Sequence, residues 1–125
     1  MKRINPEKVW KPTDFVHATM NRTVMVTSGQ TGRDANGKIA GDVFSDQARQ
    51  ALTNIRNIAE SQGKSMDDIM KLTVYVKDIR YGEEYIKIME EFFNPGKKPA
   101  STLVAVTGLW DERQLIEIEA IVDMT

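Results

Sequence analysis

The chain has 125 residues, of which 41% are hydrophobic and 28% are charged, and its formal net charge is −1. It contains no cysteine and a single histidine, His17. This composition excludes disulfides, thiol nucleophiles and metal sites built from cysteine or from several histidines of one chain. The length predicts one domain over residues 1–125, and the charge balance argues against a general nucleic-acid binder. No segment approaches a membrane span or a signal peptide, so we expect a cytoplasmic protein.

The first half of the chain predicts a pair of strands followed by a long helix. Two extended stretches within residues 15–28 flank a turn at Asn21-Arg22, and the second is rich in β-branched residues. Over residues 42–62 apolar side chains recur every three or four positions, which is typical of an amphipathic helix. Gly63 can supply the left-handed residue that ends this helix, and Ser65 can cap a short helix after it.

The second half predicts a strand, a helix and two further strands. The strand covers Leu72–Val76, the helix covers Tyr81–Phe93, and the last strands cover Ser101–Val106 and Leu115–Val122. The complete order is strand–strand–helix–strand–helix–strand–strand. We therefore expect an α/β fold of the α+β type, with both helices packed on one face of a single sheet.

The opposite face of that sheet has no expected cover. Four residues that alternate with the predicted helix-facing positions lack the charge of a wetted surface: Met25, Tyr75, Leu103 and Ala105. A second subunit would bury them, so the sequence predicts an oligomer.

The ionisable and hydroxyl residues leave several interpretations open. Glu117 and Glu119 share one face of a strand, either as a solvated surface or as part of a cleft in which one carboxylate activates water. Ser28 and Ser101 have no evident base beside them, which favours hydrogen bonding or substrate positioning over nucleophilic attack. His17 is interpreted as structural or exposed, without a catalytic role.

Two other features have a plain and a functional interpretation. Trp10 and Trp110 are expected to pack at a core edge or an interface, with base stacking as the less favoured alternative. The pair Lys97-Lys98 either adds solubility or attracts an anionic ligand to a nearby cleft. No phosphate-binding, dinucleotide-binding or nucleophile-elbow motif is present.

Five segments in order resemble the Rid/YjgF family, over nearly the whole chain after about Thr13. They are Val26-Thr27-Ser28-Gly29-Gln30, Gln47–Ile55, Lys71–Asp78, Pro99-Ala100-Ser101-Thr102-Leu103-Val104 and Ile116-Glu117-Ile118-Glu119-Ala120. The resemblance implies a chorismate-mutase-like subunit, a homotrimer with ligand clefts between subunits, and chemistry that needs no cofactor and no metal. It also implies a small-molecule enamine or imine as substrate, hydrolysed to a 2-keto acid and ammonia.

The same resemblance implies a set of site residues. Glu117 corresponds to the glutamate that positions the attacking water, and Ser28 and Gly29 match the family's pocket. Phe15 stands at the position of a pocket tyrosine, because its separation from Ser28 is the same, and Ile86 stands near that of a common asparagine.

The family's substrate-binding arginine and a frequent cysteine correspond to Ser101 and Leu103. A neutral serine cannot replace a guanidinium that grips a carboxylate. The sequence therefore predicts an arginine-lacking branch whose substrate differs from ordinary amino-acid imines. Two alternatives remain: a non-catalytic metabolite-binding or regulatory trimer, and an endoribonuclease or translation inhibitor, which the charge balance disfavours.

Overall fold

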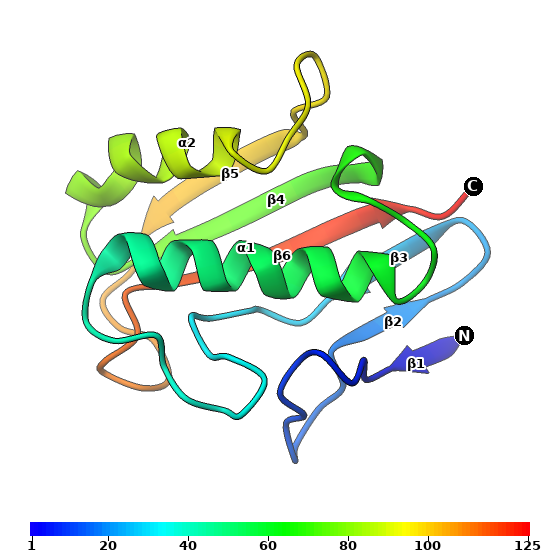
Figure 1. Cartoon of the computed structure of the whole chain (residues 1–125), viewed down its shortest axis with the longest axis horizontal. Helices are drawn as coiled ribbons and strands as arrows, with labels where there is room; N and C mark the ends of the chain where they lie inside the picture. The colour runs from blue at the N-terminus through cyan, green and yellow to red at the C-terminus, as the bar shows by residue number, and fades with distance from the viewer.

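A single six-stranded sheet with two helices forms the molecule, and the computed structural model describes residues 1–125 (Figure 1). The strands are β1 (Lys2–Ile4), β2 (Ala18–Met20), β3 (Val24–Thr27), β4 (Ile69–Val76), β5 (Ala100–Ala105) and β6 (Ile116–Asp123). The helices are α1 (Phe44–Glu60) and α2 (Gly82–Glu90), with short 3₁₀ turns at Met66–Asp68 and Ile79–Tyr81. The α+β class and the order of the expected elements are confirmed.

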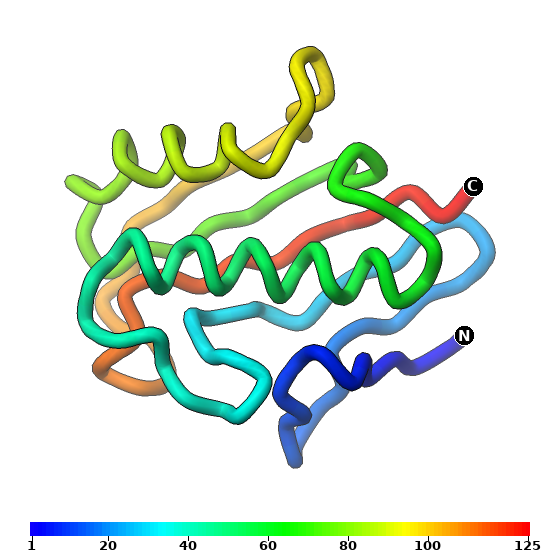
Figure 2. Tube along the Cα trace, viewed as in Figure 1, coloured from blue at the N-terminus to red at the C-terminus, as the bar shows by residue number.

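The sheet has the order β1-β2-β3-β6-β4-β5, so the last strand in the sequence lies near its middle. β4 and β5 are parallel and are joined by the crossover through α2, and every other pairing is antiparallel. The trace in Figure 2 brings both chain ends to the same end of the sheet. β1 was not expected from the sequence, because three residues with two exposed charges give no strand pattern.

Both helices lie on the same face of the sheet, as predicted (Figure 1). On β6 the even-numbered residues Ile116, Ile118, Ala120 and Val122 are buried beneath them. α1 contributes the other half of the core through one apolar stripe, made of Phe44, Ala48, Ala51, Leu52, Ile55 and Ile58. Neither helix combines the length with the apolar composition needed to cross a bilayer.

The local signals at the turns are confirmed. The Asn21 side chain accepts hydrogen bonds from the backbone N–H groups of Thr23 and Val24, which closes the β2–β3 turn. Gly63 adopts a positive φ of 74° directly after α1. Ser65 caps the first 3₁₀ turn in a reciprocal capping box with Asp68.

Three of the four residues expected on the face opposite the helices were assigned to the wrong face. Met25 is fully buried beneath the helices, since its partner on β6 is the core residue Val122. Leu103 and Ala105 pair with Val74 and Val76 of β4, which are also core residues. Side chains directly opposite in a ladder share a face, so only Tyr75 lies where it was predicted.

We call the face away from the helices the open face. Beside the partly buried Tyr75, it carries the exposed apolar residues Val26, Val104 and Ile121, on three different strands. The expectation of an uncovered apolar face therefore holds for a different set of residues.

Candidate functional site

Glu117 is the second residue of β6, and its side chain projects from the open face. Its carboxylate packs directly against the backbone of Gly29. A Cβ added at Gly29 would lie 2.6 Å from Oε1 and 2.7 Å from Cδ of Glu117, so any larger residue would collide with the carboxylate. The structure thus brings together Gly29 and Glu117, which are 88 positions apart in the sequence.

The close approach follows from how the segment after β3 is held. Gln30 and Ile118 exchange two backbone hydrogen bonds, of 2.7 and 2.9 Å, which lay residues 28–30 alongside the start of β6. The Ser28 hydroxyl donates to the Val16 carbonyl at 2.6 Å. Ser28 therefore has a hydrogen-bonding role, and no base contacts its hydroxyl.

The ionisation of Glu117 is altered by this position. Burial raises the pKa of the Glu117 carboxyl, and the nearby Glu119 carboxylate raises it further. A carboxylate that is half-buried and more basic than usual is suited to accept a proton from water. Glu117 is thus not on a fully solvated strand face, and its place in a cleft stays a prediction.

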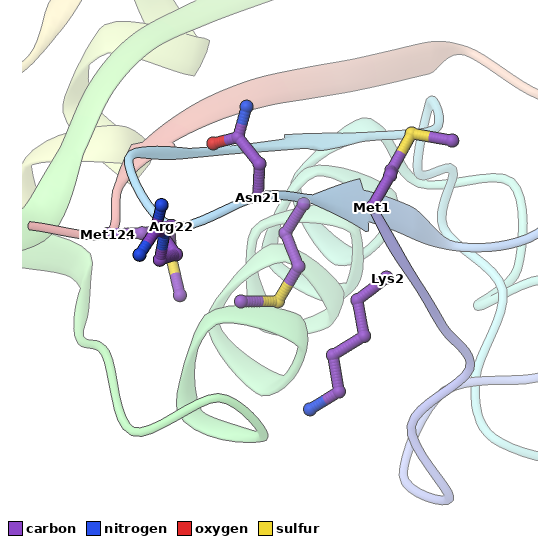
Figure 3. A pocket seen from close by; sticks show the side chains of 6 residues that line it. Met1, Lys2, Asn21, Arg22 and Met124 are labelled. Carbon is purple, nitrogen blue, oxygen red and sulfur yellow. The ribbon is translucent and has the colours of Figure 1, made fainter.

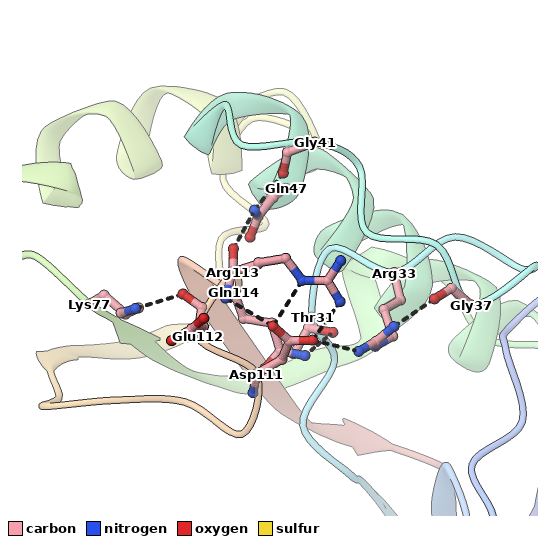
Figure 4. A network of polar contacts seen from close by, with 10 residues as sticks. All are labelled: Thr31, Arg33, Gly37, Gly41, Gln47, Lys77, Asp111, Glu112, Arg113 and Gln114. Atoms are coloured by element: carbon pink, nitrogen blue, oxygen red, sulfur yellow. Dashed lines mark hydrogen bonds and ion pairs between the residues drawn. The ribbon is translucent and has the colours of Figure 1, made fainter.

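A polar network fixes the loop that leads into β6 (Figure 4). Asp111 accepts hydrogen bonds from the side chains of Arg113 and Arg33, at 2.8 and 3.3 Å. The bonds from Arg113, with a further contribution from Arg33, hold the pKa of Asp111 well below its usual range. From α1, Gln47 donates to the Arg113 carbonyl and accepts from the Leu115 backbone N–H. The loop therefore enters β6 in a fixed position, which in turn fixes Glu117.

The single histidine is structural, as interpreted from the sequence. His17 is buried, its Nδ1 accepts a hydrogen bond from Gln30 at 3.0 Å, and its Nε2 donates to the Trp10 carbonyl. Burial lowers the pKa of His17 below its ordinary value. Both ring nitrogens are occupied by contacts that tie the N-terminal segment to the Gln30 segment.

The two tryptophans differ. Trp10 packs on Gly37 and lies 5.4 Å from the Arg33 guanidinium, which fits the expected packing role. Trp110 is 99% exposed, so it packs against nothing within the chain. Lys98 forms an exposed ion pair with Glu90 at 3.0 Å.

The expected site residues divide into two groups within one chain. We name Phe15, Ser28, Gly29 and Glu117 the glutamate half-site: Phe15 is exposed and adjoins Val16, whose carbonyl binds Ser28. We name Ile86, Ser101 and Leu103 the β5 half-site. Leu103 reaches the start of α2, with its Cδ2 3.8 Å from a Cβ built on Gly82, and exposed Ile86 lies one helical turn beyond.

These two half-sites do not meet in one chain. Glu117 is level with Tyr75 and Val104, whereas Ser101 lies three residues along β5 with its side chain on the helix-covered face. From ordinary strand spacing and rise, their Cα atoms are about 14 Å apart. One small substrate cannot touch both residues of the same copy.

Two hollows in the surface of the chain contain little of this site. One, of about 560 Å³, is open and lies beside the chain ends, where it is lined by Met1, Lys2, Met20, Asn21, Arg22 and Met124 (Figure 3). It includes no residue of either half-site. A smaller one of about 110 Å³ adjoins the glutamate half-site and is lined by Val16, Ala18, Thr19, Val26, Thr27 and Ser28.

Sequence reasoning placed Tyr75 on the face that a second subunit would cover, but gave it no role in the site. The Tyr75 hydroxyl donates to Glu119 at 2.8 Å, beside Glu117. The alternation of Tyr75 with the core residues Val74 and Val76 of β4 could place it on the open face. The pairing of β4 with β6, which brings Tyr75 next to the two glutamates, could not be read from the sequence.

Comparison with known proteins assigns the class. A family model described as "Endoribonuclease L-PSP" matches residues 8–124, and the chain belongs to this family, the Rid/YjgF family that the sequence resembled. It is 40% identical over 102 residues to the 2-iminobutanoate/2-iminopropanoate deaminase of Salmonella typhimurium, covering 79% of this chain and 78% of the relative.

Solved structures agree with this assignment. The YjgF gene product of Escherichia coli superposes with a TM-score of 0.93 at 31% identity, and the match covers 100% of both chains. Escherichia coli TdcF, solved with bound serine, has a TM-score of 0.93 at 27% identity, again over 100% of both chains.

Proposed function

We propose that the protein hydrolyses a reactive enamine or imine metabolite, without a cofactor, in clefts between the subunits of a homotrimer. The observation that carries this proposal is the packing of the Glu117 carboxylate on Gly29, which holds a basic carboxylate at a half-buried position. The relative named as an imine deaminase supports the choice of reaction.

The chemistry requires one base and a held water. The water oxygen bonds to the imine carbon while the C=N π electrons move to nitrogen. Glu117 accepts a proton from the water and returns it to the nitrogen, which gives the neutral carbinolamine and restores the carboxylate. The resulting carbinolamine re-forms a C=O bond and releases ammonia, so one water is consumed for each ammonia produced. An enamine enters the same route after tautomerising to the imine.

A cleft between two copies would unite the two half-sites, with the glutamate half-site of one subunit facing the β5 half-site of the next. The separation of about 14 Å within one chain supports this arrangement. The uncovered apolar residues Val26, Val104 and Ile121 offer a surface for subunit contact.

The expected substrate differs from ordinary amino-acid imines because Ser101 supplies no positive charge. A charge-assisted hydrogen bond to a carboxylate typically contributes about 1.5–3 kcal/mol, which corresponds to roughly tenfold or more in binding. We therefore infer a substrate that is less anionic or is anchored by another group.

The test is ammonia release from a panel of imines with and without an α-carboxylate. Glu117→Ala should abolish the release that the wild type shows, whereas Glu60→Ala, on the exposed end of α1, should not. Ser101→Arg should raise turnover of the carboxylate-bearing members by about tenfold. Equal turnover in wild type and Glu117→Ala across the panel would contradict the mechanism. Tight metabolite binding without turnover would favour the regulatory alternative.

The endoribonuclease in the family description is not proposed for this chain. Its net charge is −1, and its one histidine is held by Gln30 and the Trp10 carbonyl. General acid–base cleavage of RNA by a histidine pair has no residues available here.

A further inference from the structure

Tyr75 and Glu119 form a hydrogen-bonded pair next to Glu117 on the open face. In the β4–β6 ladder, Tyr75 is directly opposite Glu117, and Thr73 is directly opposite Glu119. The Tyr75 hydroxyl does not remain at its own level: it reaches diagonally to Glu119 and donates to Oε1 at 2.8 Å. The tyrosine ring therefore runs past Glu117 and ends on the neighbouring carboxylate.

No cation neutralises Glu119 within the chain. Two lysines of the β4 region lie on the same face, but Lys71 donates to the Thr102 hydroxyl at 2.7 Å and Lys77 donates to the Glu112 carbonyl at 2.8 Å. The residues that β5 and β3 place on this face are uncharged: Ala100, Thr102, Val104, Val24 and Val26.

The remaining charges on the open face lie farther away. Asp123 is at the other end of β6, and Arg3 is on β1, with β2 and β3 between it and β6. The Glu119 side chain is thus held by a neutral donor, about 7 Å from Glu117 by the ordinary spacing of residues two apart on a strand. That carboxylate is the charged group that raises the pKa of Glu117, second in effect to burial.

We propose that Tyr75 and Glu119 are positioning residues for the hydrolytic reaction: the tyrosine hydroxyl fixes the Glu119 carboxylate, and its fixed charge makes Glu117 a stronger proton acceptor. Neither residue contacts the reacting atoms. This inference rests on the proposed function and gives a use to the second glutamate of the strand.

Two variants separate charge from orientation. Glu119→Gln retains an amide oxygen that accepts from Tyr75 but removes the charge, whereas Tyr75→Phe keeps the charge and removes the hydrogen bond. Losing the charge lowers the pKa of Glu117, so the acid limb of the kcat/KM profile of Glu119→Gln moves to lower pH. The plateau kcat should fall by about two- to fivefold, because a weaker base accepts the proton less well. Tyr75→Phe should shift both quantities in the same direction by a smaller amount, and KM should change little in either variant.

Asp123→Asn is the matched control, because it removes a carboxylate from the same strand and face at a greater distance. Its acid limb should coincide with that of the wild type. A carbon-13 NMR titration of the Glu117 carboxyl gives a second readout that does not depend on turnover, and its midpoint should fall in Glu119→Gln.

The outcomes distinguish the two proposals. Turnover with an unmoved acid limb and an unmoved NMR midpoint in Glu119→Gln would overturn the positioning role alone. No turnover by the wild type on any imine would overturn the proposed function, and with it the catalytic use of the pair, even where the NMR midpoint responds to Glu119→Gln.

Discussion

The two faces of the sheet differ in burial and in the kind of side chain that the same strands place on them. On β6, Ile118 is fully buried beneath the helices, whereas Ile121 on the open face is 37% exposed. The helix-covered face holds the contiguous core, and the open face carries Glu117, Glu119 and scattered exposed apolar residues. One face therefore stabilises the fold, while the other is free to carry ionisable groups at little cost to folding.

Ile118→Ala and Ile121→Ala test this division with one substitution on each face of one strand. Removing a fully buried isoleucine should cost about 2–5 kcal/mol in the free energy of unfolding, because atoms are lost and a cavity is left. Ile121→Ala should cost less than about 1 kcal/mol within the chain. Urea unfolding measures both values.

Unfolding of the same two variants also tests subunit association. If copies associate through the open face, Ile121→Ala should weaken association, so at concentrations where the wild type is assembled its unfolding midpoint should gain less from added protein than that of the wild type. Equal losses in both variants at every concentration would contradict the division between the faces.

The sequence predicted the helix-covered face better than the open one, for physical reasons. In α1 the apolar residues recur with a 3.6-residue period, and in Ile116–Val122 apolar residues alternate with glutamates over most of the strand. The buried side of each element could therefore be predicted. Val24, Met25 and Val26 are all apolar, and residues 100–105 mix small and apolar side chains without alternation. In such segments only the ladder register decides the face, and register depends on partners distant in the sequence.

The candidate site was predictable only in pieces. Glu117 stood out as an acid in a strand, but its contact with Gly29 spans the chain and depends on the Gln30–Ile118 bridge. The division into two half-sites depends on β4 lying between β6 and β5. Chain order alone does not give that arrangement, because the last strand is inserted into the middle of the sheet.

Gly29→Ala tests the site on the open face. The new methyl group would overlap the Glu117 carboxylate and force it to move, so the proposed turnover should fall by about tenfold or more, since small misplacements of a reacting group are costly. Gly108→Ala is the matched control, because nothing lies within 4 Å of its added Cβ. Ammonia release measures both variants, and full activity in Gly29→Ala would contradict the assigned position of Glu117.

The pH dependence of stability tests how His17 is held. Its pKa is about 6.5 in an unfolded chain and lower in the folded protein because of burial. The unfolded state therefore binds more protons below about pH 7, so stability is full above that pH and is lost as the pH falls through about 6.5 toward the folded value.

Urea unfolding at pH 7.5 and at pH 5.5 measures this slope. His17→Gln should be less stable at both pH values, because contacts to Gln30 and Trp10 are lost, but it should lose the part of the slope that the imidazole contributes. An unchanged slope would show that other groups titrate in this range. The acidic groups with lowered pKa values, such as Glu91 beside Arg49, act at lower pH.

The smallest expected effect concerns the Tyr85 hydroxyl, a polar group buried on the helix-covered, apolar side of the sheet. Tyr85 of α2 is 1% exposed, and its hydroxyl has no hydrogen-bond partner. Burial raises the pKa of this hydroxyl far above its ordinary value. An unpaired buried hydroxyl destabilises the fold, so Tyr85→Phe should be neutral or should raise the free energy of unfolding by up to about 1 kcal/mol. Tyr75→Phe, which loses a real hydrogen bond on the open face, should show no such gain. A loss above about 1 kcal/mol in Tyr85→Phe would mean that the hydroxyl has a partner in solution, and the helix-covered face would then contain a polar contact as well.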